Sequence, residues 1–212
     1  MTAIPENEAL RYLSAPQADE SLRAEVRGVC RSMEQRVTPR SVWHEYPCSV
    51  TDASVSFGGI TFDGADLARH LKGCSALLLF AATLGIEADR MARTESLRSM
   101  ARSSMVHAAG AAMIEQYCDD VQETLGTEYE ARGLYLRPRY SPGYGDLPLS
   151  RQADFFRLLE LSKRLGLSLN EHFIMTPSKS VTAVIGISAE PTKSFRKCRN
   201  CGRTDCPFRR EG

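Results

Sequence analysis

The sequence predicts an α+β fold: a single domain in which helices flank a mainly antiparallel, twisted sheet and one long helix is buried. Its 212 residues suit one domain, and no internal repeat is present. Strand-like and helix-like apolar patterns follow one another in mixed order, with no strict strand–helix–strand alternation. The longest helical pattern covers residues 96–126. From Met105 to Cys118 it is apolar nearly all round, which is typical of a buried helix.

The first forty residues predict two helices ahead of the sheet. Leu10 and Leu13 give the segment 5–14 an apolar side. The segment 19–37 carries apolar residues at helical spacing, and Pro39 ends it. The chain is therefore expected to consist of an N-terminal helical segment, a main domain and a basic, cysteine-rich tail, at residues 1–40, 41–190 and 191–212.

Six segments have strand patterns, and three shorter ones have helical patterns. Gly58-Gly59 joins the second and third strands as a two-residue hairpin. The fourth strand is apolar on both faces, which indicates a buried strand. The expected strands are 41–48, 54–57, 60–62, 76–82, 134–140 and 181–187. The expected helices are 66–72, 86–93 and 150–165, the last of them amphipathic.

Composition and charge exclude several classes of protein. The apolar fraction is 42%, and charged residues interrupt the N-terminus, so no signal peptide is expected. The longest apolar run is too short to span a bilayer, and we expect a cytoplasmic protein without membrane attachment. The net charge is +1, but residues 193–210 hold seven basic side chains against Asp205 alone, a local charge of +6. This local excess favours a docking tail, and nucleic acid is not an expected partner.

Glu115 is the first candidate for binding chemistry, because it interrupts the apolar run of the long helix. Ala108, Ala111 and Ala112 precede it by seven, four and three residues and share its face. This leaves open space above the carboxylate, where the cationic group of a ligand could rest. A buried carboxylate needs a partner. The alternative is that this face meets solvent or that Glu115 pairs with an arginine.

The segment 137–146 is the second candidate. Arg137 and Arg139 lie two residues apart on an expected strand, so we expect both side chains on the same face. The turn that follows is rich in glycine and offers backbone N–H groups, and the ring of Tyr144 can lie against a base or a sugar. These features suit a ligand with a carboxylate at one end and an aromatic group at the other. The alternative is a surface turn after an edge strand, with which Pro138 is compatible.

The third candidate is the cysteine cluster of the tail. Seven cysteines, an odd number, do not predict a disulfide framework. Cys198, Cys201 and Cys206 lie within nine residues, and a Cys-x-x-Cys pair lets two thiolates reach one metal. The three cysteines could hold an iron–sulfur cluster with one open iron, or zinc with a fourth ligand from elsewhere. The alternative is a basic tail with spare thiols.

The segment 139–144 resembles the Arg-x-x-x-Gly-Tyr motif of the activation domain of cobalamin-dependent methionine synthases. Three more segments agree with that family in order and spacing. The segment 79–89 is similar to its strand-to-helix connection, 114–117 to its ligand-binding helix and 173–181 to its last core strand. The resemblance runs from about residue 40 to 188 and indicates the compact, free-standing version of the domain.

The resemblance implies binding of S-adenosylmethionine, with Glu115 at the amino group of the ligand and Arg139 at its carboxylate. The ligand-binding residues that the motifs carry over are Glu115, Arg139, Ser141, Pro142, Gly143 and Tyr144. The implied role is that of a reactivation partner of cobalamin-dependent methionine synthase. It presents the methyl group for reductive methylation of cob(II)alamin held by a partner protein, with one electron from a flavodoxin-type donor. Such a chain is an accessory component of a methyltransferase rather than a complete enzyme.

A second hypothesis of function rests on the tail. The chain would then be a metal-binding redox or accessory protein, with iron–sulfur or zinc at its cysteines, for another corrinoid methyltransferase. No P-loop, Gly-x-Ser-x-Gly elbow or Rossmann fingerprint is present, which disfavours ATP-binding, hydrolase and nicotinamide-dependent functions.

Overall fold

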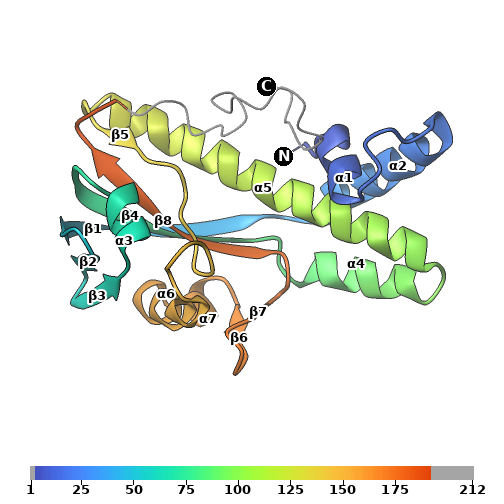
Figure 1. The fold of residues 1–212 in the computed structure, drawn as a ribbon. Coiled ribbons are helices and arrows are strands. Elements are labelled where there is room, and N and C mark those ends of the chain that lie inside the picture. The colour runs from blue at the N-terminus through green and yellow to red at the C-terminus, as the bar shows by residue number, and fades with distance from the viewer. Residues whose placement is uncertain (1–2, 192–212) are drawn as a thin grey trace.

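The computed structural model describes residues 3–191 and has the α+β architecture that the sequence predicts (Figure 1). Six strands form one sheet in the order β3-β2-β1-β4-β8-β5, and β6 pairs with β7 in a small separate hairpin. The strands are β1 (Arg40–Val50), β2 (Ser54–Phe57), β3 (Ile60–Asp63), β4 (Cys74–Thr83), β5 (Tyr135–Leu136), β6 (Ser168–Leu169), β7 (Met175–Thr176) and β8 (Ser180–Ser188). The helices are α1 (Glu6–Tyr12), α2 (Glu20–Arg36), α3 (Ala65–His70), α4 (Ile86–Ser96), α5 (Met100–Glu130), the 3-10 turn η1 (Leu149–Arg151), α6 (Gln152–Leu159) and α7 (Leu161–Arg164).

Strand β4 lies inside the sheet because its side chains are apolar on both faces. It pairs antiparallel with β1 on one side and with β8 on the other, where Phe80 stands opposite Ala183. Side chains alternate along a strand, so Leu78 and Phe80 pack toward α5 while Leu77 and Leu79 pack into the opposite layer. All four are fully buried. The two faces of one strand therefore join two hydrophobic cores.

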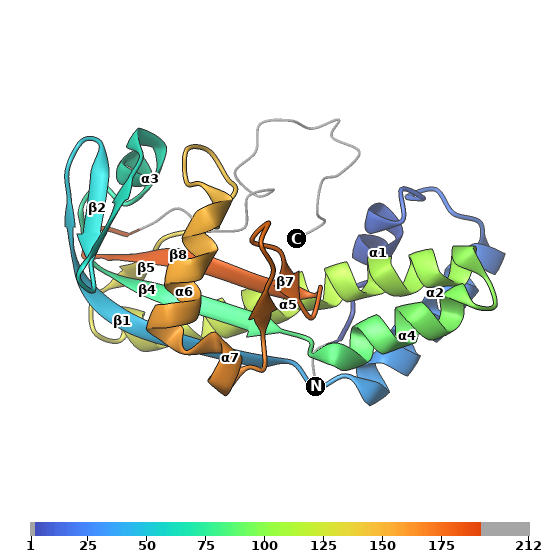
Figure 2. The ribbon, with the colours of Figure 1, turned by 90° about the horizontal axis from the view of Figure 1, so that it is seen from below.

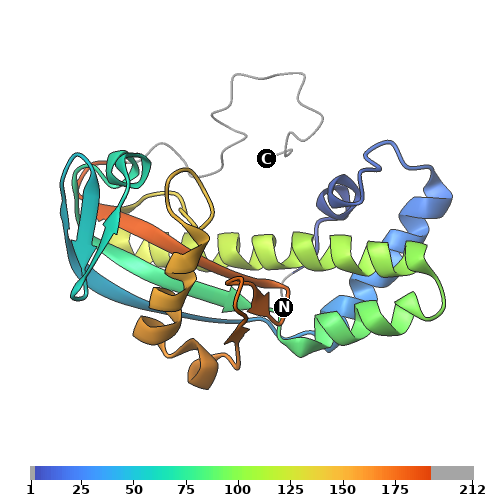
Figure 3. The same cartoon turned by 60° about the horizontal axis from the view of Figure 1, so that its bottom comes forward.

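The long helix α5 connects the sheet to the N-terminal helices. It begins after Ser99, whose side chain accepts a hydrogen bond from the backbone N–H of Arg102 at 3.3 Å. Figure 2 shows α1, α2 and α4 gathered around the first part of α5, and Figure 3 shows the sheet beneath the remainder. Met105 and Cys118 are buried, which confirms the predicted buried helix. Within residues 3–191 no helix is both long and apolar enough to cross a membrane.

In the layer opposite α5, one sequence prediction is wrong. The segment 150–165 is not a single helix but the turn η1 followed by α6 and α7. The break is at Glu160, which adopts a left-handed backbone conformation with φ of 50°. The change in direction lets Leu161 and Leu165 join Phe155 in the buried core of this layer. Burial of these apolar side chains outweighs the continuous helical pattern.

Candidate functional site

Arg139 is the centre of the candidate site and bonds to three side chains of α5. Its Nη2 donates to Asp119 Oδ1 at 2.7 Å and to Glu115 Oε2 at 3.1 Å, and its Nη1 donates to Gln122 Oε1 at 3.0 Å. Gln122 in turn donates from Nε2 to the carbonyl of Arg137 at 2.9 Å. The guanidinium is thus fixed by three side chains of α5, and one of these, Gln122, is itself held by the backbone of Arg137.

The charge of Arg139 is stabilised although the side chain is only 15% exposed. Burial by itself lowers the pKa of an arginine, but the neighbouring charges, the carboxylates of Asp119 and Glu115 among them, outweigh burial and raise the pKa of Arg139. The two carboxylates are more open than the arginine, with 26% of the Asp119 side chain and 35% of the Glu115 side chain exposed. The pair therefore presents one cation and one anion side by side near the surface.

A β-bulge turns Arg139 toward α5. Leu136 stands opposite Ile187 on β8, and the backbone of Tyr140 exchanges two hydrogen bonds with Val184, at 2.8 and 2.9 Å. Between these two pairs the chain advances four residues, from Leu136 to Tyr140, whereas β8 advances only three, between Ile187 and Val184. The segment before Tyr140 therefore contains one extra residue. An extra residue reverses the alternation of side chains beyond it. Without the bulge, Arg139 would point away from α5.

The bulge also corrects the expectation that Arg137 and Arg139 share a face. Arg137 lies on the side of the sheet away from α5, where its side chain packs beside Gly186 and bonds to Ser188 Oγ at 3.5 Å. It also approaches the thiol of Cys74. Correspondingly, the expected strand 134–140 is regular only over β5 and then leaves the sheet ladder. Residues two apart on a strand, such as these arginines, point to the same face only where the pleat is unbroken.

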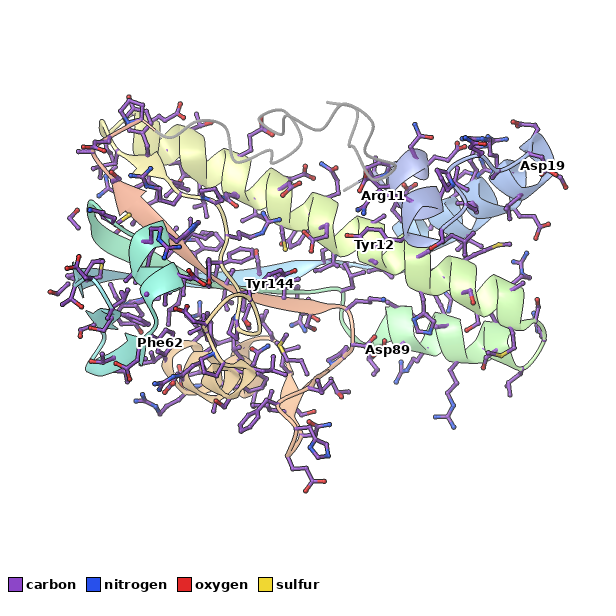
Figure 4. The ribbon with its side chains drawn as sticks, viewed as in Figure 1. Arg11, Tyr12, Asp19, Phe62, Asp89 and Tyr144 are labelled. Atoms are coloured by element: carbon purple, nitrogen blue, oxygen red, sulfur yellow. The ribbon has the colours of Figure 1, made fainter. Side chains whose placement is uncertain are left out.

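The loop after Arg139 is a compact turn that crosses in front of β8 (Figure 4). The backbone N–H of Tyr144 donates to Ser141 at 3.1 Å, and that of Gly143 donates to Leu147 at 2.8 Å. Gly143 has φ of 92°, which side chains rarely allow. Pro142 is buried beneath the turn, whereas the side chain of Tyr144 is 64% exposed. A ligand could therefore reach the backbone of the turn and the ring of Tyr144 from solvent.

Asp146 anchors the far end of this loop to α3. Its carboxylate accepts hydrogen bonds from the backbone N–H groups of Asp66 at 2.7 Å and Leu67 at 3.3 Å. A β-carbon added at Gly145 would lie 2.1 Å from the hydroxyl oxygen of Tyr140, so only glycine fits there. The loop is consequently held at both ends, by α5 through Arg139 and by α3 through Asp146.

A family model described as the vitamin B12 dependent methionine synthase, activation domain, matches residues 77–206. This match covers more than half of the chain and includes Glu115 and the whole 139–144 loop segment. The chain belongs to this family. Comparison with curated proteins gives no match.

A solved structure supports the fold of this activation-domain chain. It is described as the crystal structure of the MetH reactivation domain bound to AdoHcy, and it shares 17% sequence identity with this chain. The alignment covers 91% of this chain and 76% of the other, with a TM-score of 0.65. At this identity the likeness concerns the fold, which confirms the predicted arrangement of sheet and long buried helix.

In this chain Glu115 and Arg139 are in direct contact. The adjoining loop contains Ser141, Pro142, Gly143 and Tyr144. The alternative in which Glu115 pairs with an arginine is therefore realised within the chain itself. Sequence reasoning missed Asp119 and Gln122, although their spacing from Glu115 by four and seven residues puts them on the same helical face. It also missed Asp146, for which no local signal exists, since α3 lies about eighty residues earlier.

Metal binding by this activation-domain chain was expected at Cys198, Cys201 and Cys206, which lie outside the described residues. Within residues 3–191 no group of three or more His, Cys, Asp or Glu side chains is placed to hold a metal. Hollows of about 490 and 550 Å³ on the described part lie beside α3 and beside the β2–β3 hairpin, away from Arg139.

Proposed function

We propose that this chain binds S-adenosylmethionine at the Arg139–Glu115 pair and presents its methyl group for reductive methylation of cob(II)alamin on a partner protein. The observation that carries the proposal is the contact at 3.1 Å between Arg139, whose side chain is 15% exposed, and Glu115, whose side chain is 35% exposed, next to a glycine turn. Two opposite charges in contact match the ammonium and the carboxylate of an amino acid. That the related MetH reactivation domain is described as bound to AdoHcy supports the same ligand chemistry here.

In this proposal the ligand takes the place of the internal ion pair. The ammonium of the ligand binds Glu115, and its carboxylate binds Arg139 through charge-assisted hydrogen bonds. Asp119 and Gln122 keep Arg139 in position while Glu115 is released, because they bond to it at 2.7 and 3.0 Å independently of Glu115. The backbone of Gly143 admits the ligand closely, and the exposed ring of Tyr144 contacts its nucleoside.

S-adenosylmethionine supplies an electrophilic methyl group, which leaves sulfur for cobalt while the sulfur keeps the bonding electron pair and S-adenosylhomocysteine remains. Cob(II)alamin needs one electron beforehand, which we assign to a flavodoxin-type donor. The residues of this chain would hold the amino-acid end, and the loop is open to solvent at Tyr144, where a partner can approach. The cobalamin-binding part of methionine synthase is the proposed partner, and this chain acts as its accessory component.

Calorimetric titration with S-adenosylmethionine tests the proposal. The unmodified chain should bind, and Arg139→Met should weaken binding by at least about 30-fold, since about 2 kcal/mol of charge-assisted bonding is lost. Arg139→Lys keeps the charge but not the planar fork and should lie between the two. The matched control is Arg157→Met on α6, where the arginine is 61% exposed and outside the site. A folded chain that does not bind, or an Arg139→Met variant that binds as the parent does, would overturn the proposal.

The second hypothesis, a metal-binding redox or accessory protein for another corrinoid methyltransferase, rests on the close spacing of the tail cysteines in the sequence. The family match extends to residue 206 and so includes Cys198, Cys201 and Cys206. Iron–sulfur clusters absorb visible light and zinc does not, so the absorbance spectrum and elemental analysis of the anaerobically purified chain distinguish the two metals. Metal that persists in a variant with all three cysteines changed to serine would exclude this site.

A further inference from the structure

The second half of α5 has a strongly acidic surface. Residues 115–130 contain no lysine or arginine. They contain six carboxylates, namely Glu115, Asp119, Asp120, Glu123, Glu128 and Glu130. Glu115, Asp119 and Glu123 are spaced by four residues and share one line along the helix, and Asp120 lies beside them. Like charges at this spacing repel one another, so this surface favours a cationic partner.

In the described part of the chain, Arg139 compensates part of this charge. Arg139 bonds to Glu115 and Asp119, whereas Asp120 accepts a hydrogen bond from the neutral amide of Gln116 at 2.7 Å. The helices α1, α2 and α4 gather around the other half of α5 (Figure 2). A net negative surface therefore continues from the Arg139–Glu115 pair to the C-terminal end of α5.

A basic segment follows β8 in the sequence. Residues 193–210 have a local charge of +6 and begin five residues after the last residue of β8. The last residue of β8, Ser188, stands opposite Tyr135, which is five residues beyond the end of α5. Figure 1 shows the end of β8, β5 and the C-terminal end of α5 close together.

The chain is long enough to return along α5. Cys198 comes seven residues after Pro191, and an extended chain over seven residue steps spans up to about 25 Å. The distance along α5 from Glu130 back to Glu115 is about 22 Å, at 1.5 Å per residue. Cys198 and the two cysteines after it can therefore reach the level of Glu115.

We propose that residues 193–210 dock along the acidic surface of α5, formed by residues 115–130, and bring the three tail cysteines beside the Arg139–Glu115 pair. The contacts are charge pairs at a surface, so salt weakens them. The covalent connection through Pro191 makes docking intramolecular and independent of protein concentration. If the cysteines hold a metal, docking would bring it close to the candidate ligand site. Docking is measured without ligand, so it succeeds or fails separately from the proposed function.

Zero-length carbodiimide cross-linking of the full chain, read by mass spectrometry, tests the docking. Lys197 should link to Asp120 or Glu123 within one chain, and dilution should not change the yield. Raising the salt from about 0.02 to about 0.5 M should reduce the yield at least fivefold, because the screening length falls well below 10 Å. Links that form mainly between chains, or a yield that salt leaves unchanged, would overturn the proposal.

Charge exchange makes the test specific. Asp120→Lys with Glu123→Lys should abolish the link, and adding Lys197→Glu should restore a link between the exchanged partners. The matched control is Glu25→Lys with Glu171→Lys, two exposed carboxylates outside the acidic surface of residues 115–130, which should leave the link unchanged. If Lys197 links to Glu25 or Glu171 as often as to α5, the segment has no preferred docking surface and the proposal is wrong. Circular dichroism of each variant excludes unfolding as the cause.

Discussion

Glu115→Gln separates the role of Glu115 in binding from its role in stability. Without ligand, Glu115 Oε2 accepts from Arg139 at 3.1 Å, and the glutamate side chain is 35% exposed. Solvent screens a pair as open as this, so we expect a loss of less than about 1 kcal/mol in the free energy of unfolding. Arg139 keeps the shorter bond to Asp119 at 2.7 Å and should not move.

The effect on binding is expected to be larger than the effect on stability. A charge-assisted hydrogen bond from the ligand ammonium to Glu115 contributes about 1.5–3 kcal/mol. Part of this is offset in the parent, because Glu115 must first leave Arg139, at a cost of up to about 1 kcal/mol. Glu115→Gln loses the bond to the ligand ammonium, but it also avoids the cost of separating Glu115 from Arg139. The Kd for S-adenosylmethionine should therefore rise about 5- to 30-fold, which corresponds to about 1–2 kcal/mol.

Paired titrations measure this difference. S-adenosylmethionine and 5′-methylthioadenosine share the nucleoside, but only the first carries the ammonium and the carboxylate. Glu115→Gln should weaken binding of the first and leave binding of the second unchanged. Glu128→Gln, an exposed glutamate near the end of the same helix, is the matched control and should change neither. Equal affinity of parent and Glu115→Gln for S-adenosylmethionine would refute the assignment of the ammonium to Glu115.

The loop and the buried thiols give two further predictions. Gly145→Ala puts a β-carbon 2.1 Å from the Tyr140 hydroxyl at φ of +51°, so the loop must shift. We expect at least about tenfold weaker ligand binding and a loss of about 1–3 kcal/mol in urea unfolding, and a variant equal to the parent in both measurements would show that the loop is not fixed there. Burial raises the pKa of Cys30 and Cys48 to about 11 and that of Cys118 to about 12. With the tail cysteines changed to serine, alkylation at about pH 8 should be at least about 100-fold slower in the folded than in the unfolded chain. The unfolded thiols lose their protons near pH 8.5, so the free energy of unfolding should fall as the pH rises from there toward 11; rapid alkylation of the folded chain would contradict the burial.

Hydrophobic pattern predicted the elements that form the cores. The segment 76–82, apolar on both faces, is the inner strand β4, and the all-round apolar stretch from Met105 is the buried part of α5. These predictions succeed because burial acts on many residues at once. The prediction of one helix over residues 150–165 is wrong for a local reason. The left-handed backbone conformation of Glu160 does not change the amphipathic pattern of the sequence.

The candidate site was predictable only in part. Motifs pointed to Glu115 and Arg139, but the expectation that Arg137 shares the face of Arg139 assumed a regular strand. A bulge is set by pairing with β8, about fifty residues later in the chain, and single-sequence periodicity does not contain that information. Asp146 was missed for the same reason, because its partner α3 is distant in sequence.

The site lies where α5 changes character, and this position explains its chemistry. From Ala108 to Ile114 the helix is buried except at Ala111, and beyond Cys118 the carboxylates of Glu123, Glu128 and Glu130 are exposed. A glutamate at this boundary is buried enough to need a cation and exposed enough to exchange one. The bulge supplies that cation by turning Arg139 toward the helix, and Asp119 and Gln122 retain it when Glu115 is engaged elsewhere. A zwitterionic ligand can then replace one ion pair by two without leaving a buried charge uncompensated, which is the condition for binding at low cost in stability.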